Sequence, residues 1–228
     1  PTPATAETIY KIASATKQFT SALVMQLVED GKVRLDDDIR THLPDAPTNG
    51  RRVTIAQLLD HTSGIRSYTG LGPAVSRDSF RIDLTPDRIV AMLRDVPPDF
   101  EPGTSFLYNN TGYLLAGMLI EKLTGRPYAE VLRERILDPL GMSRTSYCDE
   151  RAIVPLRAKG YLRRAGGFAN AVGESMAIPH AAGAICSTVL DLVRFRRALA
   201  HGQVIKEESF RRMIEPTVLT NGWKTNYG

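Results

Sequence analysis

The stretch that decides the fold is "IASATKQFTSALVMQLVEDG", residues 12–31. Between Phe19 and Val28, apolar residues cover most of the circumference of the expected helix. This pattern predicts a buried helix over residues 15–30 that ends at Gly31. At its start Ser14 precedes Lys17 by three residues, and residues three apart share one helix face. The sequence therefore brings a hydroxyl and an amine together at the N-terminal end of a buried helix.

This S-x-x-K pair has the chemistry of acyl transfer. A serine hydroxyl is a weak nucleophile until a base removes its proton, and a lysine becomes a base only when its ammonium form is disfavoured. Burial and the partial positive charge of a helix N-terminus both disfavour that form. Backbone N–H groups at the same end can bind an oxyanion. The alternative is an N-capping Ser14 followed by a surface Lys17, and the motif alone does not decide between them.

A second buried helix is expected over residues 112–123, and Tyr108-Asn109-Asn110 precedes it. This is the only Y-x-N in the chain, just as Ser14-x-x-Lys17 is the only S-x-x-K. A tyrosinate beside a lysine ammonium can take a proton from serine and later from water. An asparagine amide can donate to and accept from an amide substrate. The same residues are typical of a turn, and taken alone they favour the turn.

A third stretch, "LLDHTSGI", contains Asp60, His61 and Ser63 and invites a Ser-His-Asp interpretation. The chain has no G-x-S-x-G elbow, and sequence neighbours rarely form such a triad. We expect His61 to hold a helix end or a loop by hydrogen bonding instead. The Gly/Ser/Arg-rich residues 64–80 that follow are expected to form an irregular loop at the border of a cleft.

Helical patterns dominate the remaining chain and strand signals are few. Thr85 and Thr188 are expected to cap two amphipathic helices. Such helices are predicted at residues 54–60, 85–96, 129–137, 187–200 and 207–214. Weak strand patterns lie at residues 51–55 and 145–148 and around Tyr161.

Composition excludes several classes of protein. The chain has 228 residues, 43% hydrophobic and 24% charged, which is normal for a soluble globular protein. Its net charge of +4 comes from scattered pairs of basic residues without a long run, so no nucleic-acid partner is expected. No apolar run reaches membrane-spanning length. The histidines show no metal-ligand spacing. Cys148 and Cys186 are expected to be two buried thiols, with a disulfide between them as the alternative.

Several stretches, taken together and in this order, resemble the class C β-lactamase family of serine hydrolases. That family includes penicillin-binding-protein-like D,D-carboxypeptidases, D-aminopeptidases and S-x-x-K esterases. The stretches are "YKIASATKQFTSALVMQLVEDGKVRLDDDI", "VTIAQLLDHTSGI", "EPGTSFLYNNTGYLLAGMLIEKLTG", "ILDPLGM" and "AAGAICSTVLDLVRF".

The resemblance implies an α+β fold of the β-lactamase/transpeptidase type, in which a helical lobe packs beside an antiparallel sheet. Residues 1–228 are expected to form a single domain of this kind, mainly the helical lobe, without the terminal sheet strands. The resemblance makes Ser14 the acylated nucleophile, Lys17 its activating partner, Tyr108 the general base and Asn110 a substrate contact. It implies no cofactor and no metal, and suggests a periplasmic or secreted protein.

The substrate implied is a small molecule or a peptide with a reactive amide or ester carbonyl, such as a β-lactam, a D-amino-acid peptide or a small ester. The family's third motif, K-T-G or H-x-G, is expected beyond residue 228. Lys224-Thr225 is expected to be a decoy, because Asn226 replaces the glycine. The chain alone is therefore expected to be impaired as a hydrolase. The alternative function is a penicillin-binding sensor or scaffold that is acylated without turnover.

Overall fold

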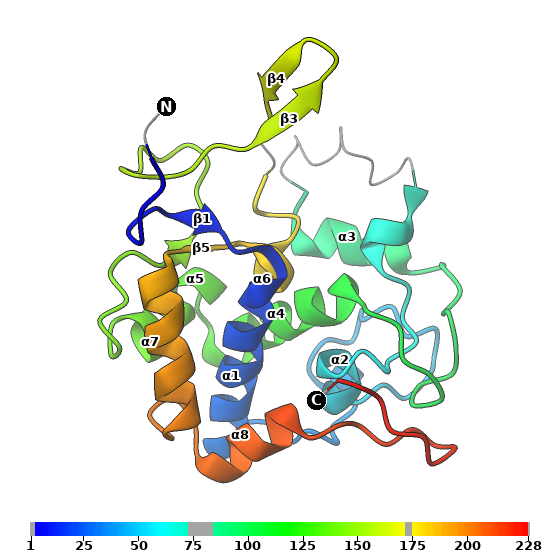
Figure 1. Cartoon of the computed structure of the whole chain (residues 1–228). Helices are drawn as coiled ribbons and strands as arrows, with labels where there is room; N and C mark the ends of the chain where they lie inside the picture. Colours follow the sequence, from blue (N-terminus) through cyan, green and yellow to red (C-terminus); the bar gives the residue numbers. More distant parts are fainter. Residues whose placement is uncertain (1–2, 73–83, 172–174, 228) are drawn as a thin grey trace.

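The helix α1 (Thr16–Glu29) runs through the middle of the molecule in the computed structural model, which describes residues 3–72, 84–171 and 175–227 (Figure 1). Its apolar side chains are buried, and it packs against α4 (Asn110–Thr124) and α6 (His180–Gly183). Gly31 follows with a φ of +70°, a conformation that suits glycine and stops the helix. Both predicted buried helices are therefore confirmed, and they lie against each other.

The other predicted helices are present, and the two predicted caps, Thr85 and Thr188, are confirmed. Thr54, Thr85 and Thr188 each accept a hydrogen bond from the backbone N–H three residues later. The predicted helix over residues 129–137 divides into α5 and a π-helical turn. The bounds are α2 Ile55–Leu59, α3 Pro86–Leu93, α5 Tyr128–Leu132, π-helix η6 Arg133–Leu137, α7 Val189–Ala200, α8 Glu207–Ile214, and 3-10 helices η1 Ala13–Ala15, η2 Ile39–Thr41 and η3 Tyr68–Gly70.

None of the helices in the described ranges is long and apolar enough to cross a membrane.

The strands among the described residues form two small antiparallel sheets. β1 (Tyr10–Lys11) and β2 (Ser146–Tyr147) pair with the two edges of β5 (Ile185–Ser187). β3 (Tyr161–Arg164) and β4 (Gly167–Asn170) form a hairpin that projects from the body (Figure 1). The strand predicted over residues 51–55 is wrong: only Thr54 makes an isolated bridge, with Asp38, before the helix α2 begins.

β5 holds the turn that carries Ser14. The backbone N–H of Ile12 donates to the Ile185 carbonyl at 3.0 Å. The backbone N–H of Ile185 in turn donates to Thr16 Oγ1, within the first turn of α1, at 3.1 Å. The small three-stranded sheet is therefore attached on both sides of the serine, although its strands are too short to give a sequence signal.

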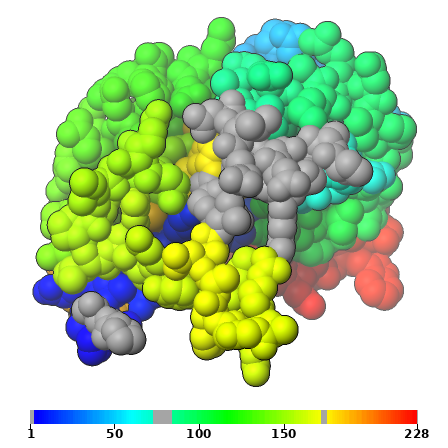
Figure 2. All heavy atoms as spheres, turned by 90° about the horizontal axis from the view of Figure 1, so that it is seen from above, coloured from blue at the N-terminus to red at the C-terminus, as the bar shows by residue number. Residues whose placement is uncertain are grey.

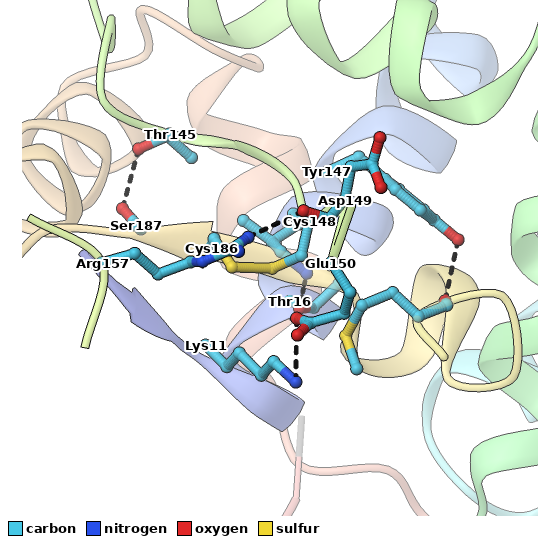
Figure 3. The surroundings of a disulfide bond; sticks show 12 residues. Lys11, Thr16, Thr145, Tyr147, Cys148, Asp149, Glu150, Arg157, Cys186 and Ser187 are labelled. Carbon is cyan, nitrogen blue, oxygen red and sulfur yellow. Dashed lines mark hydrogen bonds and ion pairs between the residues drawn. A yellow bond between two sulfur atoms is a disulfide. The ribbon is translucent and has the colours of Figure 1, made fainter. Parts of the chain in front are cut away.

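A disulfide joins β5 to the residue that follows β2, which corrects the prediction of two buried thiols. Cys148 and Cys186 are bonded, with their Cα atoms 5.3 Å apart (Figure 3), a normal separation for a disulfide. The backbone N–H of Cys148 donates to the Ala184 carbonyl at 2.8 Å. The antiparallel pairing of β2 with β5 thus brings together two cysteines that are 38 residues apart in the sequence.

Loss of this disulfide is expected to destabilise the fold. Replacing both Cys148 and Cys186 with serine should lower the free energy of unfolding by roughly 2–4 kcal/mol, because the crosslink restricts the unfolded chain. Urea unfolding of the wild type with and without dithiothreitol measures the same difference. The double serine variant is the control, since a reductant should leave its midpoint unchanged. An equal midpoint for the wild type under both conditions would contradict a stabilising disulfide.

Candidate active site

Ser14 lies in the 3-10 turn η1, immediately before α1. Ala13 precedes it with a φ of +46°, in the left-handed region that is unfavourable for alanine. The Ser14 side chain is exposed, whereas Lys17, one turn further on, is only 3% exposed. The chain therefore presents the hydroxyl to solvent and keeps the amine beneath it.

The Lys17 amine has three close oxygen neighbours. Its Nζ lies 3.2 Å from Ser14 Oγ, 2.8 Å from Asn110 Oδ1 and 2.9 Å from the Ala182 carbonyl. Two of these oxygens, the Asn110 amide oxygen and the Ala182 carbonyl oxygen, can accept hydrogen bonds but cannot donate them. A neutral amine that donates its two protons to them turns its lone pair toward Ser14. Burial lowers the pKa of Lys17 to about 8, so this neutral form is within reach near neutral pH.

The Ala182 carbonyl is a site group that the sequence did not indicate, because any residue type can supply a backbone oxygen. It comes from α6, which lies directly against α4. A Cβ placed on Gly117 would be only 2.5 Å from the Ala181 Cβ. The Ala181 carbonyl accepts from Thr20 Oγ1 at 2.7 Å. Two successive carbonyls of α6 therefore bind Lys17 and Thr20, which lie one turn apart on α1.

The Y-x-N motif lies at the N-terminus of α4, as the turn interpretation predicts, and it faces Lys17. Asn109 caps the helix through a hydrogen bond from the Gly112 N–H to its Oδ1 at 2.9 Å. Lys17 Nζ lies 4.8 Å from the centroid of the Tyr108 ring, and the Tyr108 side chain is 43% exposed. The structure thus brings all four predicted site residues, Ser14, Lys17, Tyr108 and Asn110, to one place.

The loop after His61 is fixed to the same helix end. Ser67 Oγ accepts from the Asn110 N–H at 3.3 Å, and Thr111 Oγ1 accepts from the Tyr68 N–H at 2.9 Å. Residues 64–72 of the predicted loop lie next to the site and include the short helix η3, and residues 73–80 lie outside the described ranges. Figure 2 looks onto this end, where dark-blue N-terminal atoms are visible in a hollow beside the yellow β3–β4 hairpin.

Asp60, His61 and Ser63 do not form a triad. Each of the three side chains is bonded to a different neighbour. His61 Nδ1 accepts a hydrogen bond from the Asn109 N–H at 3.1 Å. Asp60 Oδ1 accepts one from the Thr62 hydroxyl, and Ser63 Oγ accepts one from the Ile65 N–H. The prediction that His61 holds a loop by hydrogen bonding is confirmed. Within the described residues, no group of three or more His, Cys, Asp and Glu side chains could hold a metal ion.

The buried histidines are expected to make the fold sensitive to acid. Burial lowers the pKa of both His61 and His180 from 6.5 to about 4. Between these values the unfolded chain binds more protons, so the free energy of unfolding falls as the pH falls. At pH 5 each histidine should contribute a loss of about 2 kcal/mol relative to pH 7. Burial raises the pKa of Asp60 and Glu121, which offsets part of this loss.

A substitution at His180 separates the contribution of this histidine to the pH dependence from the contributions of Asp60 and Glu121. His180→Asn keeps a residue type that tolerates the φ of +38° at this position. The difference in unfolding free energy between pH 7 and pH 5, from urea titrations, should shrink by about 2 kcal/mol. An unchanged difference would show that His180 is not the group that resists protonation.

The sequence matches the Beta-lactamase family over residues 1–226. Among curated proteins, Penicillin-binding protein 4* of Bacillus subtilis (strain 168) is 31% identical over 243 residues, covering 99% of this chain and 52% of that protein. The chain spans about half the length of the curated relatives it matches.

Solved structures agree with this match. A D-stereospecific amidohydrolase from Streptomyces sp. has a TM-score of 0.83 and 32% identity, with 93% of this chain and 67% of that chain covered. The D-amino acid amidase from Ochrobactrum anthropi SV3, complexed with D-phenylalanine, has a TM-score of 0.81 and 32% identity, with 92% and 62% covered. The predicted β-lactamase/transpeptidase-like fold is confirmed. With a family match over nearly its whole length, the chain belongs to the Beta-lactamase family.

Proposed function

We propose that this chain carries the acylation machinery of a serine hydrolase that cleaves an amide or ester bond through an acyl-enzyme. The observation that supports it most is the position of Lys17 Nζ, held by two obligate acceptors and 3.2 Å from the exposed Ser14 hydroxyl. A surface lysine following an N-capping serine would have no such set of contacts. Ser14 also caps nothing, since Ala15 is the N-cap of α1.

The proposed reaction has two stages. Ser14 Oγ attacks the substrate carbonyl carbon while its proton passes to Lys17 or to a Tyr108 phenolate. The oxygen–carbon bond forms, the bond to the amine or alcohol breaks, and the leaving group takes up the proton. Water then adds to the acyl carbon with Tyr108 as base, which releases the acid and restores the Ser14 hydroxyl.

The remaining groups have binding roles in this proposal. Because Asn110 Oδ1 accepts from Lys17, its Nδ2 protons are left to donate to a substrate carbonyl. The backbone N–H of Ser14 contributes to the oxyanion hole. The substrate class proposed is an amide of a D-amino acid. Its support is the similarity to two solved proteins, the D-stereospecific amidohydrolase and the D-amino acid amidase.

The test is to treat the complete protein with a fluorophosphonate and with a penicillin, and to locate the adduct by mass spectrometry of its peptides. We expect both labels on Ser14 and none after heat denaturation. Hydrolysis of D-phenylalanine amide, L-phenylalanine amide and a p-nitrophenyl ester then ranks the substrates, and the D-amide should exceed the L-amide. A label on Ser63 instead of Ser14 would refute the assignment.

A second candidate is a penicillin-binding sensor that is acylated but not deacylated. Its support is the name of the Bacillus relative, a penicillin-binding protein. The two candidates differ in the lifetime of the adduct. A penicillin adduct on Ser14 that persists for hours, without release of hydrolysed penicillin or amide product, would favour the sensor.

A further inference from the structure

We propose that His61 is a positioning residue that fixes Tyr108 beside Lys17. This inference rests on the proposed function, because it concerns the proton transfer assigned there to Tyr108. His61 has no part in the reaction scheme above, yet its side chain is 1% exposed and its backbone φ is +65°. A buried, non-glycine residue in this conformation is unfavourable in energy, so the surrounding contacts must hold it in place.

His61 binds the backbone on both sides of Tyr108. Its carbonyl accepts from the Leu107 N–H at 3.1 Å, and its ring Nδ1 accepts from the Asn109 N–H at 3.1 Å. These two hydrogen bonds fix the residue before and the residue after the tyrosine. The direction in which Tyr108 leaves the main chain is therefore set by one histidine.

The imidazole ring also supports the Tyr108 ring directly. The two ring centroids are 4.5 Å apart, which is close contact for aromatic rings. The rings of Phe106, Tyr113 and Tyr227 pack around His61 with centroids 4.7–5.9 Å away. The phenol of Tyr108 thus lies against a rigid aromatic base, with Lys17 over its face.

The hydrogen bond from Asn109 dictates the protonation of the ring. Nδ1 can accept only when it carries no proton, so the neutral ring holds its proton on Nε2. The ionisable side chains around His61 are Lys17 of α1, whose charge acts on the imidazole, and Tyr108, Tyr113 and Tyr227, whose rings contact it. Burial, followed by the charge of Lys17, keeps the pKa of His61 at about 4. Protonation of Nδ1 would break the bond to Asn109 and release Tyr108.

Two substitutions separate the hydrogen bond from the ring contact. His61→Phe keeps an aromatic ring but cannot accept from Asn109, and kcat/KM for acylation should fall roughly 100-fold because Tyr108 is misplaced. His61→Asn offers an oxygen near the Nδ1 position and tolerates a positive φ. The kcat/KM for acylation of this variant should stay within about tenfold of the wild-type value, since the variant lacks only the contact between the two rings. KM should change little in either variant, because His61 lies beneath Tyr108.

Thr54→Ala is the matched control. It removes the cap of α2, the helix that leads to His61, and should lower the urea midpoint of unfolding while leaving kcat/KM unchanged. If Thr54→Ala and His61→Phe lower kcat/KM equally, or if His61→Asn is no better than His61→Phe, His61 has only a structural role and the inference fails.

The wild-type protein offers a readout that needs no variant and no activity. In an imidazole nitrogen NMR spectrum His61 should be the Nε2–H tautomer from pH 8 down to about pH 5, without titrating near pH 6.5. An Nδ1–H tautomer or an ordinary titration would overturn the inference. A wild type that is not acylated at Ser14 would instead overturn the proposed function and leave the tautomer result standing.

Discussion

Replacing Ser14 with alanine will abolish both the covalent adduct and turnover, with kcat/KM falling by roughly 10⁴-fold or more in the complete protein. Any residual rate enhancement would come from substrate binding and oxyanion stabilisation, since the nucleophile is absent. The variant should fold normally, because the Ser14 side chain is exposed and does not cap α1. Its unfolding free energy should stay within about 0.5 kcal/mol of the wild type.

Ser63→Ala is the matched control for this prediction. Ser63 belongs to the competing Ser-His-Asp interpretation, but its Oγ accepts from the Ile65 N–H within its own loop. We expect Ser63→Ala to retain the fluorophosphonate adduct and most of the turnover. The two variants are labelled under the same conditions. An adduct that persists in Ser14→Ala and is lost in Ser63→Ala would show that Ser63, not Ser14, is the nucleophile.

Much of the helical architecture follows from local signals that act within a few residues. The apolar circumference between Phe19 and Val28 predicts a buried helix, and the capping threonines predict helix starts, because both effects depend on short-range geometry. The pair Ser14 and Lys17 follows for the same reason, since three residues along a helix always bring side chains to one face. For Tyr108 and Asn110, the residues alone favoured a turn, and the ordered family resemblance supplied the prediction of a site.

The remaining features depend on contacts between distant segments. The disulfide joins Cys148 to Cys186 because β2 pairs with β5, and strands of two and three residues carry almost no periodicity. The Ala182 carbonyl reaches Lys17 because α6 packs against Gly117, and a backbone oxygen has no sequence signature. The bond from the Asn109 N–H to His61 joins two loops whose relative placement only the folded core defines.

Substitution of Lys17 is expected to cause the second large loss of activity. Lys17→Met replaces the amine with a neutral, unbranched side chain of similar length, and kcat/KM for acylation should fall roughly 10³-fold because the amine that lies 3.2 Å from Ser14 Oγ is lost. Lys17→Arg should not restore the rate, since a guanidinium keeps its proton in proteins and offers no lone pair. Stopped-flow acylation with a chromogenic ester measures both variants.

The pH dependence distinguishes a lysine base from a lysine that acts only as a cation. Burial lowers the pKa of Lys17 to about 8, so the fraction of neutral amine, and with it kcat/KM, should rise with pH to a plateau with a midpoint near 8. This limb should be absent in Lys17→Met. A cationic role would give the opposite sign, a rate that falls as the pH passes 8, together with partial rescue by Lys17→Arg. In the neutral amine, the contacts from Nζ to Asn110 Oδ1 and the Ala182 carbonyl use both protons and leave the lone pair for Ser14. An ammonium would instead donate to all three oxygens, so the sign of the pH dependence decides between the two roles.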